Sequence, residues 1–80
     1  MKYEVIVELK EEVLDTQGRA IQQTFQRLGH STLTEVRVSK RFVLDVEGDE
    51  TQGLALVQKL AAEHLANTVA ETFICRKLGT

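Results

Sequence analysis

The sequence predicts an α+β fold, a two-layer sandwich in which a four-stranded antiparallel sheet carries two helices on one face. Four segments alternate apolar and polar residues, as half-buried strands do. Two longer segments place apolar residues three or four positions apart, as amphipathic helices do. The segments occur in the order β-α-β-β-α-β, which is typical of the ferredoxin-like arrangement. With 80 residues the chain has room for one domain, and we expect it to span residues 1–80.

The first predicted strand runs from Lys2 to Lys10. Charged and apolar residues alternate along it, except that Ile6 falls on the charged side. One face of the strand should therefore pack in the core, while the other points away from the helices. The residues of the apolar face are Tyr3, Val5, Val7 and Leu9.

The first predicted helix spans residues 16–28. Asp15 precedes it and suits the N-cap position, because its carboxylate can accept a hydrogen bond from a free backbone amide of the first turn. Gly29 follows the helix, where a left-handed residue commonly ends it. The apolar stripe that we expect on the sheet consists of Ala20, Ile21, Phe25 and Leu28.

The next two segments, residues 33–38 and 40–47, predict a hairpin that turns near Ser39. In the second of them, apolar residues alternate with charged ones, which indicates a strand with one buried face. If Phe42 faces the helices, then Arg41 and Val43 face away from them.

Asp49 is expected to cap a second helix that runs to about Ala66, with Gln52 at the position of a capping box. Gly53 lies in its first turn and costs about 1 kcal/mol relative to alanine, so we expect that turn to be soft. Residues 69–78 form the last predicted strand. The buried stripe of the helix consists of Leu54, Val57, Leu60, Ala61 and Leu65.

Composition argues against several classes of function. The formal net charge is −2, so the chain lacks the concentrated positive field on which nucleic-acid binding depends. No stretch approaches the roughly 18 apolar residues of a membrane span, and the alternating N-terminal segment does not resemble a signal peptide. A single cysteine without an export signal indicates the cytoplasm. A small domain without disulfides often gains stability by forming oligomers.

No catalytic, cofactor-binding or metal-binding constellation is evident. Cys75 alternates with Phe73 in the last strand, and we expect it to be a buried packing residue rather than a nucleophile. His30 and His64 lie far apart in the sequence and lack the spacing of metal ligands. We therefore expect no catalytic residue, cofactor or metal in this chain.

Two surface features suggest protein contacts. Ile6, Val43 and Ile74 should cluster among charges on the face of the sheet that points away from the helices, and we expect this face to form a homo-oligomer. The basic residues Arg37, Lys40 and Arg41 lie near the predicted hairpin turn. They fit either a solvated turn or contacts with carboxylates of a partner.

The sequence resembles the PurS family, the small subunit of bacterial phosphoribosylformylglycinamidine synthase. Four stretches carry the resemblance: residues 9–21, 27–30, 35–48 and 64–73. Thr16 and Thr68 stand where the family has proline, and neither change removes a chemical group. The matching residues are Lys10, Asp15, Gly18, Ala20, Gly29, Arg37, Lys40, Leu65, Ala66, Asn67, Val69 and Glu71.

The resemblance implies a non-catalytic subunit that bridges a glutaminase and a large ATP-dependent synthetase. Ammonia from glutamine then converts formylglycinamide ribonucleotide to formylglycinamidine ribonucleotide in purine biosynthesis. The resemblance further implies a homodimer or higher oligomer, and a complex that uses ATP, magnesium and glutamine. The residues expected to contact the partner subunits are Lys10, Asp15, Arg37, Lys40, Arg41 and Asn67.

Three other functions are compatible with the fold. A small oligomeric regulatory domain would bind a ligand between subunits, but the acidic, bulky connection at residues 10–15 offers no glycine-rich loop for it. An acylphosphatase-like enzyme needs an anion cradle at the same place, where Glu11, Glu12 and Asp15 would repel phosphate. A binder of single-stranded nucleic acid needs exposed aromatic residues in a basic groove, which this sequence lacks.

Overall fold

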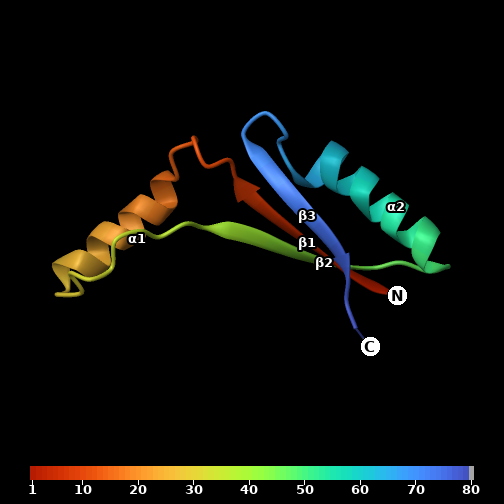
Figure 1. The fold of residues 1–80 in the computed structure, drawn as a ribbon, viewed down its shortest axis with the longest axis horizontal. Coiled ribbons are helices and arrows are strands. Elements are labelled where there is room, and N and C mark those ends of the chain that lie inside the picture. The colour runs from red at the N-terminus through yellow and green to blue at the C-terminus, as the bar shows by residue number, and fades with distance from the viewer. Residues whose placement is uncertain (80) are drawn as a thin grey trace.

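A computed structural model describes residues 1–79 as a three-stranded antiparallel sheet with two helices, in the order β-α-β-α-β. A single π-helical turn, η1, extends the second helix (Figure 1). Among these residues, no helix has both the length and the apolar character needed to cross a membrane. The elements are β1 (Lys2–Leu9), α1 (Thr16–Arg27), β2 (Ser39–Asp45), α2 (Glu50–Leu60), η1 (Ala61–Leu65) and β3 (Glu71–Lys77).

Strand β1 lies in the middle of the sheet and pairs with β2 on one side and β3 on the other. The register places Val5 between Phe42 and Cys75, and Ile6 between Arg41 and Ile74. Because side chains alternate along a strand, the sheet has two different faces. We call the face under α2 the inner face; its residues are Tyr3, Val5, Val7, Phe42, Leu44, Phe73 and Cys75. The opposite, outer face includes Glu4, Ile6, Arg41, Val43, Ile74 and Arg76.

The core forms where α2 and η1 pack across the inner face over β1 and β3. Val57 and Ala61 lie one helical turn apart on α2 and η1, and both are fully buried against β1. Asp49 caps α2 as expected, since its carboxylate accepts a hydrogen bond from the backbone N–H of Gln52 at 2.8 Å. The π-helical turn ends the helix with a bond from the N–H of Ala66 to the carbonyl of Ala61.

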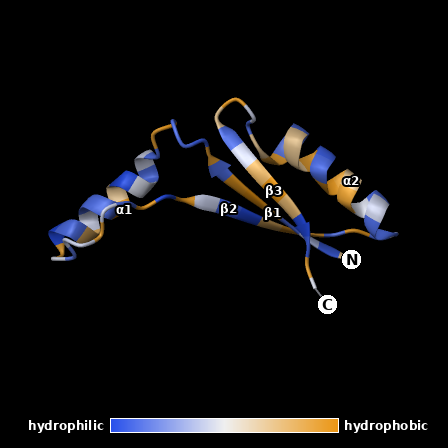
Figure 2. Cartoon of the chain, in the orientation of Figure 1, coloured by the Kyte–Doolittle hydropathy of each residue, from blue (hydrophilic) through white to orange (hydrophobic). Residues whose placement is uncertain are grey.

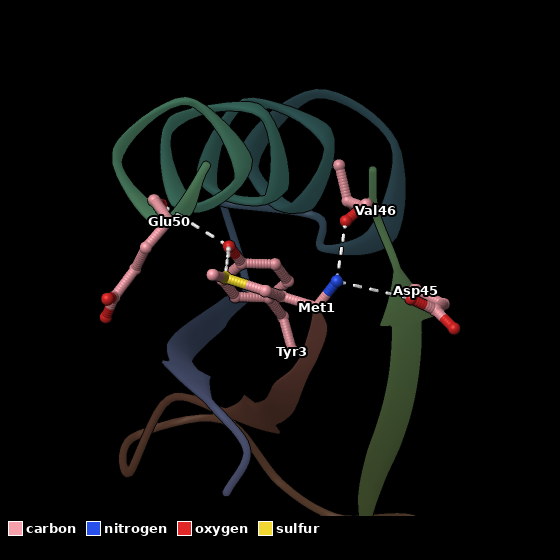
Figure 3. Close-up of polar contacts among 5 residues, drawn as sticks. All are labelled: Met1, Tyr3, Asp45, Val46 and Glu50. Carbon is pink, nitrogen blue, oxygen red and sulfur yellow. Dashed lines mark hydrogen bonds and ion pairs between the residues drawn. The ribbon is translucent and has the colours of Figure 1, made fainter. Parts of the chain in front are cut away.

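Tyr3 explains the glycine in the first turn of α2. Its ring is fully buried, and its hydroxyl donates to the carbonyl of Glu50 at 3.3 Å (Figure 3). A Cβ atom at Gly53 would lie 2.3 Å from that hydroxyl oxygen. The glycine therefore admits the tyrosine, which packs against this turn. Beside it, the amino group of Met1 donates to the carbonyl of Val46 at 2.9 Å, which joins the start of β1 to the end of β2 (Figure 3).

The prediction of a fourth strand at residues 33–38 was wrong. This segment is extended but has no strand partner among the described residues, and it continues directly into β2 (Figure 1). A tight hairpin near Ser39 would favour glycine or asparagine, which adopt left-handed conformations readily, and neither is present there. Without a turn the segment cannot fold back onto the outer edge of β2, which stays unpaired among the described residues.

The expectation that both helices cover one face was also wrong. Helix α1 begins and ends close to the predicted residues, with Asp15 as its N-cap and Gly29 left-handed at φ 101°, but it projects away from the sheet (Figure 1). The radius of gyration is 16.1 Å, whereas a compact chain of this length has about 12 Å. Figure 2 shows short apolar stretches on an otherwise hydrophilic α1, and Phe25 and Leu28 are exposed. We call α1 with the extended segment 33–38 the arm.

Candidate functional site

Asp15 joins the two parts of the arm, helix α1 and the extended segment. One carboxylate oxygen accepts from the backbone N–H of Gly18 at 2.8 Å, and the other accepts from that of Val38 at 2.6 Å. The residue is only 6% exposed. The hydrogen bond from Val38, followed by that from Gly18, lowers the pKa of the Asp15 carboxyl below its ordinary value. A single carboxylate thus caps α1 and holds the returning chain beside it.

Arg37 fixes the same junction from the other side. Its guanidinium donates to the carbonyl oxygens of Leu9 at 3.3 Å, Lys10 at 3.1 Å and Val13 at 3.2 Å. These carbonyls belong to the end of β1 and the loop that follows, and that of Lys10 also accepts from the backbone N–H of Val13 at 2.9 Å. Arginine can satisfy several acceptors at once because its donors form a rigid planar fork.

Gly18 completes the junction because only glycine fits there. A Cβ atom at this position would lie 2.2 Å from the carbonyl oxygen of Val36 and 2.8 Å from a carboxylate oxygen of Asp15. The first turn of α1 and the extended segment therefore approach each other more closely than any other residue type would allow. We call Asp15, Gly18 and Arg37, with the backbone of residues 36–38, the clasp.

Two other predicted partner residues lie near the clasp. The backbone N–H of Lys10 donates to the carbonyl of Ala70 at 2.9 Å, which brings the turn before β3 to the end of β1. In that turn the side chain of Asn67 accepts from the N–H of Val69 at 3.2 Å. Asn67 also donates its own N–H to Glu71 at 2.8 Å. The turn is therefore held by side-chain as well as backbone hydrogen bonds.

The remaining two predicted partner residues lie on β2 and point in opposite directions. Lys40 is exposed and pairs with Val7, so it lies on the inner side of the sheet. Arg41 pairs with Ile6 and lies on the outer face. The six predicted residues thus do not form one surface. The structure brings Lys10, Asp15 and Arg37 together and places Asn67 beside them, while Arg41 belongs to a different site.

That site is an ion-pair cluster on the outer face. Glu4, in the central strand, accepts hydrogen bonds from the Nε groups of Arg41 on β2 and Arg76 on β3, one at each carboxylate oxygen. Glu4 is only 3% exposed, whereas more than half of each arginine side chain is exposed. The bond from Arg41, followed by that from Arg76, lowers the pKa of Glu4 below its ordinary value.

Sequence analysis missed Glu4 and Arg76 as members of this cluster. Alternation places Glu4 on the polar side of its strand, but only the strand register shows that two arginines cover it. The three apolar residues predicted for this face are next to the cluster. Ile6 pairs with Ile74, and Val43 pairs with Glu4; Val43 is 49% exposed and Ile74 is 58% exposed.

The residues that could support chemistry are dispersed. The Cys75 thiol is half-buried on the inner face, and burial raises its pKa. His30 follows α1 and packs its ring edge-on against Phe25, while His64 lies exposed in η1. Among residues 1–79, no group of three or more His, Cys, Asp or Glu side chains could hold a metal ion. Two open hollows of about 300 and 550 Å³ flank Arg37, and both are lined mainly by polar side chains.

Comparison with known proteins connects this geometry to one family. The family model for PurS, phosphoribosylformylglycinamidine (FGAM) synthase, matches residues 2–78. The PurS subunit of phosphoribosylformylglycinamidine synthase from Mycobacterium leprae is 43% identical over 67 residues, covering 84% of this chain and 82% of that protein.

Solved structures give the same result. PurS from Methanocaldococcus jannaschii, one of the subunits of formylglycinamide ribonucleotide amidotransferase, is 30% identical with a TM-score of 0.86, and 98% of each chain is covered. A chain in the structure of PurLQS from Thermotoga maritima is 26% identical with a TM-score of 0.87, covering 96% of this chain and 95% of that one. The fold with a projecting arm is therefore common to these proteins.

Proposed function

This chain belongs to the PurS family and is a subunit of FGAM synthase, the PurLQS ligase complex of purine biosynthesis, and we propose that it acts there as a non-catalytic bridge between the synthetase and the glutaminase. Its likeness to a chain in the PurLQS structure, over nearly all of both chains, is the observation that carries this proposal. The cytoplasm is the compartment that fits this role.

The bridge would connect two reactions that must share an unstable intermediate. The glutaminase releases ammonia from glutamine, and the synthetase uses that ammonia with ATP and magnesium to convert formylglycinamide ribonucleotide to formylglycinamidine ribonucleotide. These substrates and cofactors belong to the partners in this proposal. The dispersed positions of Cys75, His30 and His64 agree with a subunit that supplies surfaces rather than reacting groups.

A second copy of the chain is the first partner that we propose. Helix α1 exposes an apolar face formed by Ala20, Ile21 and Phe25, whereas α2 packs over β1 and β3 and leaves Phe42 and Leu44 of β2 only half-buried. The exposed helix face and the half-covered sheet face lie too far apart in one protomer to meet (Figure 1). In a reciprocal dimer, each arm would cover the inner face of the other protomer.

Such an exchange would complete the fold that the sequence pattern predicts. The arm of one protomer would provide the second helix of the partner's layer, and residues 33–38 would lie beside the partner's sheet as its fourth strand. Burying an aromatic or branched side chain contributes about 1.5–3 kcal/mol, so a few such residues on each arm suffice to hold a dimer. The apolar surfaces that the extended shape of one protomer leaves exposed would then be buried in the dimer.

Substitution of Phe25 tests the dimer. Phe25→Lys places a charge in the middle of the helix face and should convert the dimer to a monomer in light scattering. Leu56→Lys is the matched control, because Leu56 on α2 is also 43% exposed but lies outside the arm. A Phe25→Lys protein with the mass of the wild type would refute the exchange.

Turnover tests the bridging function. We would mix purified synthetase and glutaminase and measure formylglycinamidine ribonucleotide from either glutamine or free ammonia, with and without this chain. The glutamine-driven reaction should require the chain, and the ammonia-driven reaction of the synthetase should not. The proposal fails if the chain changes neither reaction and joins no complex.

A further inference from the structure

The outer face of the sheet is still uncovered after the arm is accounted for. Helix α2 and η1 lie on the inner face, and α1 points away from the sheet, so no element within residues 1–79 covers the outer one (Figure 1). We call the residues at its centre the arginine face; they are Glu4, Ile6, Arg41, Val43, Ile74 and Arg76.

Glu4 holds the two arginines of this face in fixed positions. Each guanidinium donates through Nε to a separate oxygen of the Glu4 carboxylate, while its Nη groups have no hydrogen-bond partner within residues 1–79. The buried carboxylate cancels one of the two positive charges, so the cluster retains a charge of about +1. An arginine that is already positioned loses less side-chain entropy on binding than a free one.

Apolar side chains lie beside these donors. Val43 and Ile74 are about half exposed on the two outer strands, and Ile6 lies between them on β1. Arginine is enriched and lysine depleted at protein interfaces, and the buried centre of an interface is more apolar than its rim. The face therefore offers apolar contact area together with donors suited to a carboxylate.

A second copy does not satisfy these donors. If two outer faces pack about a two-fold axis along the strands, the register puts Arg41 opposite Ile74 and Arg76 opposite Val43. If the axis runs across the strands through Val5, Arg41 meets Val43 and Arg76 meets Ile74 instead. In both of these two-fold arrangements, the guanidinium groups of Arg41 and Arg76 lie against apolar side chains of the second copy.

Carboxylates of the chain itself are also badly placed for this purpose. Glu8 lies beyond the cluster toward one end of β1, opposite Ser39. Asp45 lies at the other end, where it pairs with Lys2 in the register and with the amino group of Met1 at 3.5 Å. An occupant that pairs with the arginines must therefore bring its own acidic group.

We propose that the arginine face binds an acidic, apolar segment of one of the two larger subunits of the complex. A carboxylate of that segment accepts from the Nη groups of Arg41 and Arg76, while aliphatic side chains on either side of it pack on Val43 and Ile74. This inference rests on the proposed bridging function and assigns a surface to it. The arm holds the two copies together, and the arginine face is left free for a larger subunit.

Two variants test the surface, one for each of its components. Ile74→Asp puts a negative charge in the apolar part, and Arg41→Gln removes one guanidinium while leaving Arg76 on Glu4. Leu56→Asp and Lys59→Gln on α2 are matched controls for the apolar and the charge change. Thermal unfolding confirms that each variant is folded, and light scattering gives the mass of the chain alone.

Binding of each variant to the purified synthetase and to the purified glutaminase is then measured at low and high salt. For one of the two partners, Ile74→Asp and Arg41→Gln should each weaken binding about tenfold or more, with unchanged mass of the chain alone. Arg41→Gln should also make binding to that partner less dependent on salt concentration, because one charged contact is removed. The controls should bind as the wild type does.

The other outcomes separate the two proposals. If Ile74→Asp lowers the mass of the chain alone, the outer face joins copies of this chain, and the inference is overturned in favour of a homo-oligomer through Ile6, Val43 and Ile74. If the wild type binds a partner and both variants bind it as tightly as the wild type does, the arginine face is excluded as the binding surface, while the bridging function stands. If the wild type binds neither partner, the bridging function itself fails.

Discussion

Replacing Gly18 by alanine should loosen the clasp where α1 meets the extended segment. The added Cβ would lie 2.2 Å from the carbonyl oxygen of Val36, about 1 Å closer than such atoms normally approach. The neighbour is a backbone atom, and it is held by bonds of the adjacent residues, from Arg37 to three carbonyls and from the N–H of Val38 to Asp15. The strain must therefore lengthen at least one of these bonds.

The expected loss of stability is the difference between the cost of crowding at the clasp and the gain in helix propensity. Overpacking a closely packed site costs about 1–3 kcal/mol, and a weakened hydrogen bond adds about 1 kcal/mol. Alanine is better than glycine in a helix by about 1 kcal/mol, which offsets part of this cost. The net destabilisation should be about 1–3 kcal/mol, or a decrease in Tm of roughly 5–20 °C for a domain of this size.

Urea unfolding and amide hydrogen exchange measure this effect globally and locally. The N–H groups of Gly18 and Val38, which both donate to Asp15, should exchange faster in Gly18→Ala, because opening of the clasp exposes them. Gly79→Ala is the control, since a Cβ there meets no atom within 4 Å. Equal unfolding midpoints and equal exchange in Gly18→Ala and wild type would show that the close approach to Val36 does not exist.

Three further predictions concern the core, the second helix and pH. Gly53→Ala should destabilise the chain by about 1–3 kcal/mol through contact with the Tyr3 hydroxyl, and should do so less in a Tyr3→Phe background; equal penalties in thermal unfolding would exclude that contact. Asp49→Ala removes the N-cap of α2 and should lower the free energy of unfolding, measured with urea, by about 1 kcal/mol. An unchanged free energy of unfolding would show that the backbone N–H of Gln52 does not depend on Asp49 for a partner. The folded-state pKa of Glu4 lies below its ordinary value of 4.5, so its contribution to stability is present above that pH and is lost as the pH falls through the folded pKa. Glu4→Gln should therefore flatten the decline in the urea midpoint on acidification below about pH 4.5, and an unchanged slope would show that Glu4 is not ion-paired.

Local rules were sufficient for the helices and for the strands at the ends of the chain. The caps at Asp15 and Asp49 and the left-handed Gly29 depend on backbone groups within a few residues, so the sequence alone determines them. Alternation located β1 and β3 for the same reason, since a strand with one buried face has a period of two residues wherever its partners lie.

The failed predictions depend on which segments meet in space. An amphipathic helix such as α1 must cover its apolar face, but the pattern does not say whether its own sheet or another molecule provides the cover. Residues 33–38 alternate like a strand, but they run into β2 without a turn, so they cannot fold back onto its outer edge. Glu4 is a similar case, because its burial depends on the register that brings Arg41 and Arg76 over it.

The family resemblance also acquires a physical meaning from these contacts. Asp15, Gly18 and Arg37, on which the predicted resemblance partly rests, are engaged with the chain's own backbone and set the direction of the arm. Asn67 similarly forms the turn before β3. Substitutions at these positions should affect assembly mainly through the shape of the protomer. Arg41 differs from them, because more than half of its side chain is exposed on a face that no described element covers. A direct contact with a larger subunit is therefore to be sought at Arg41 and its neighbours on the outer face, and an indirect effect at the clasp.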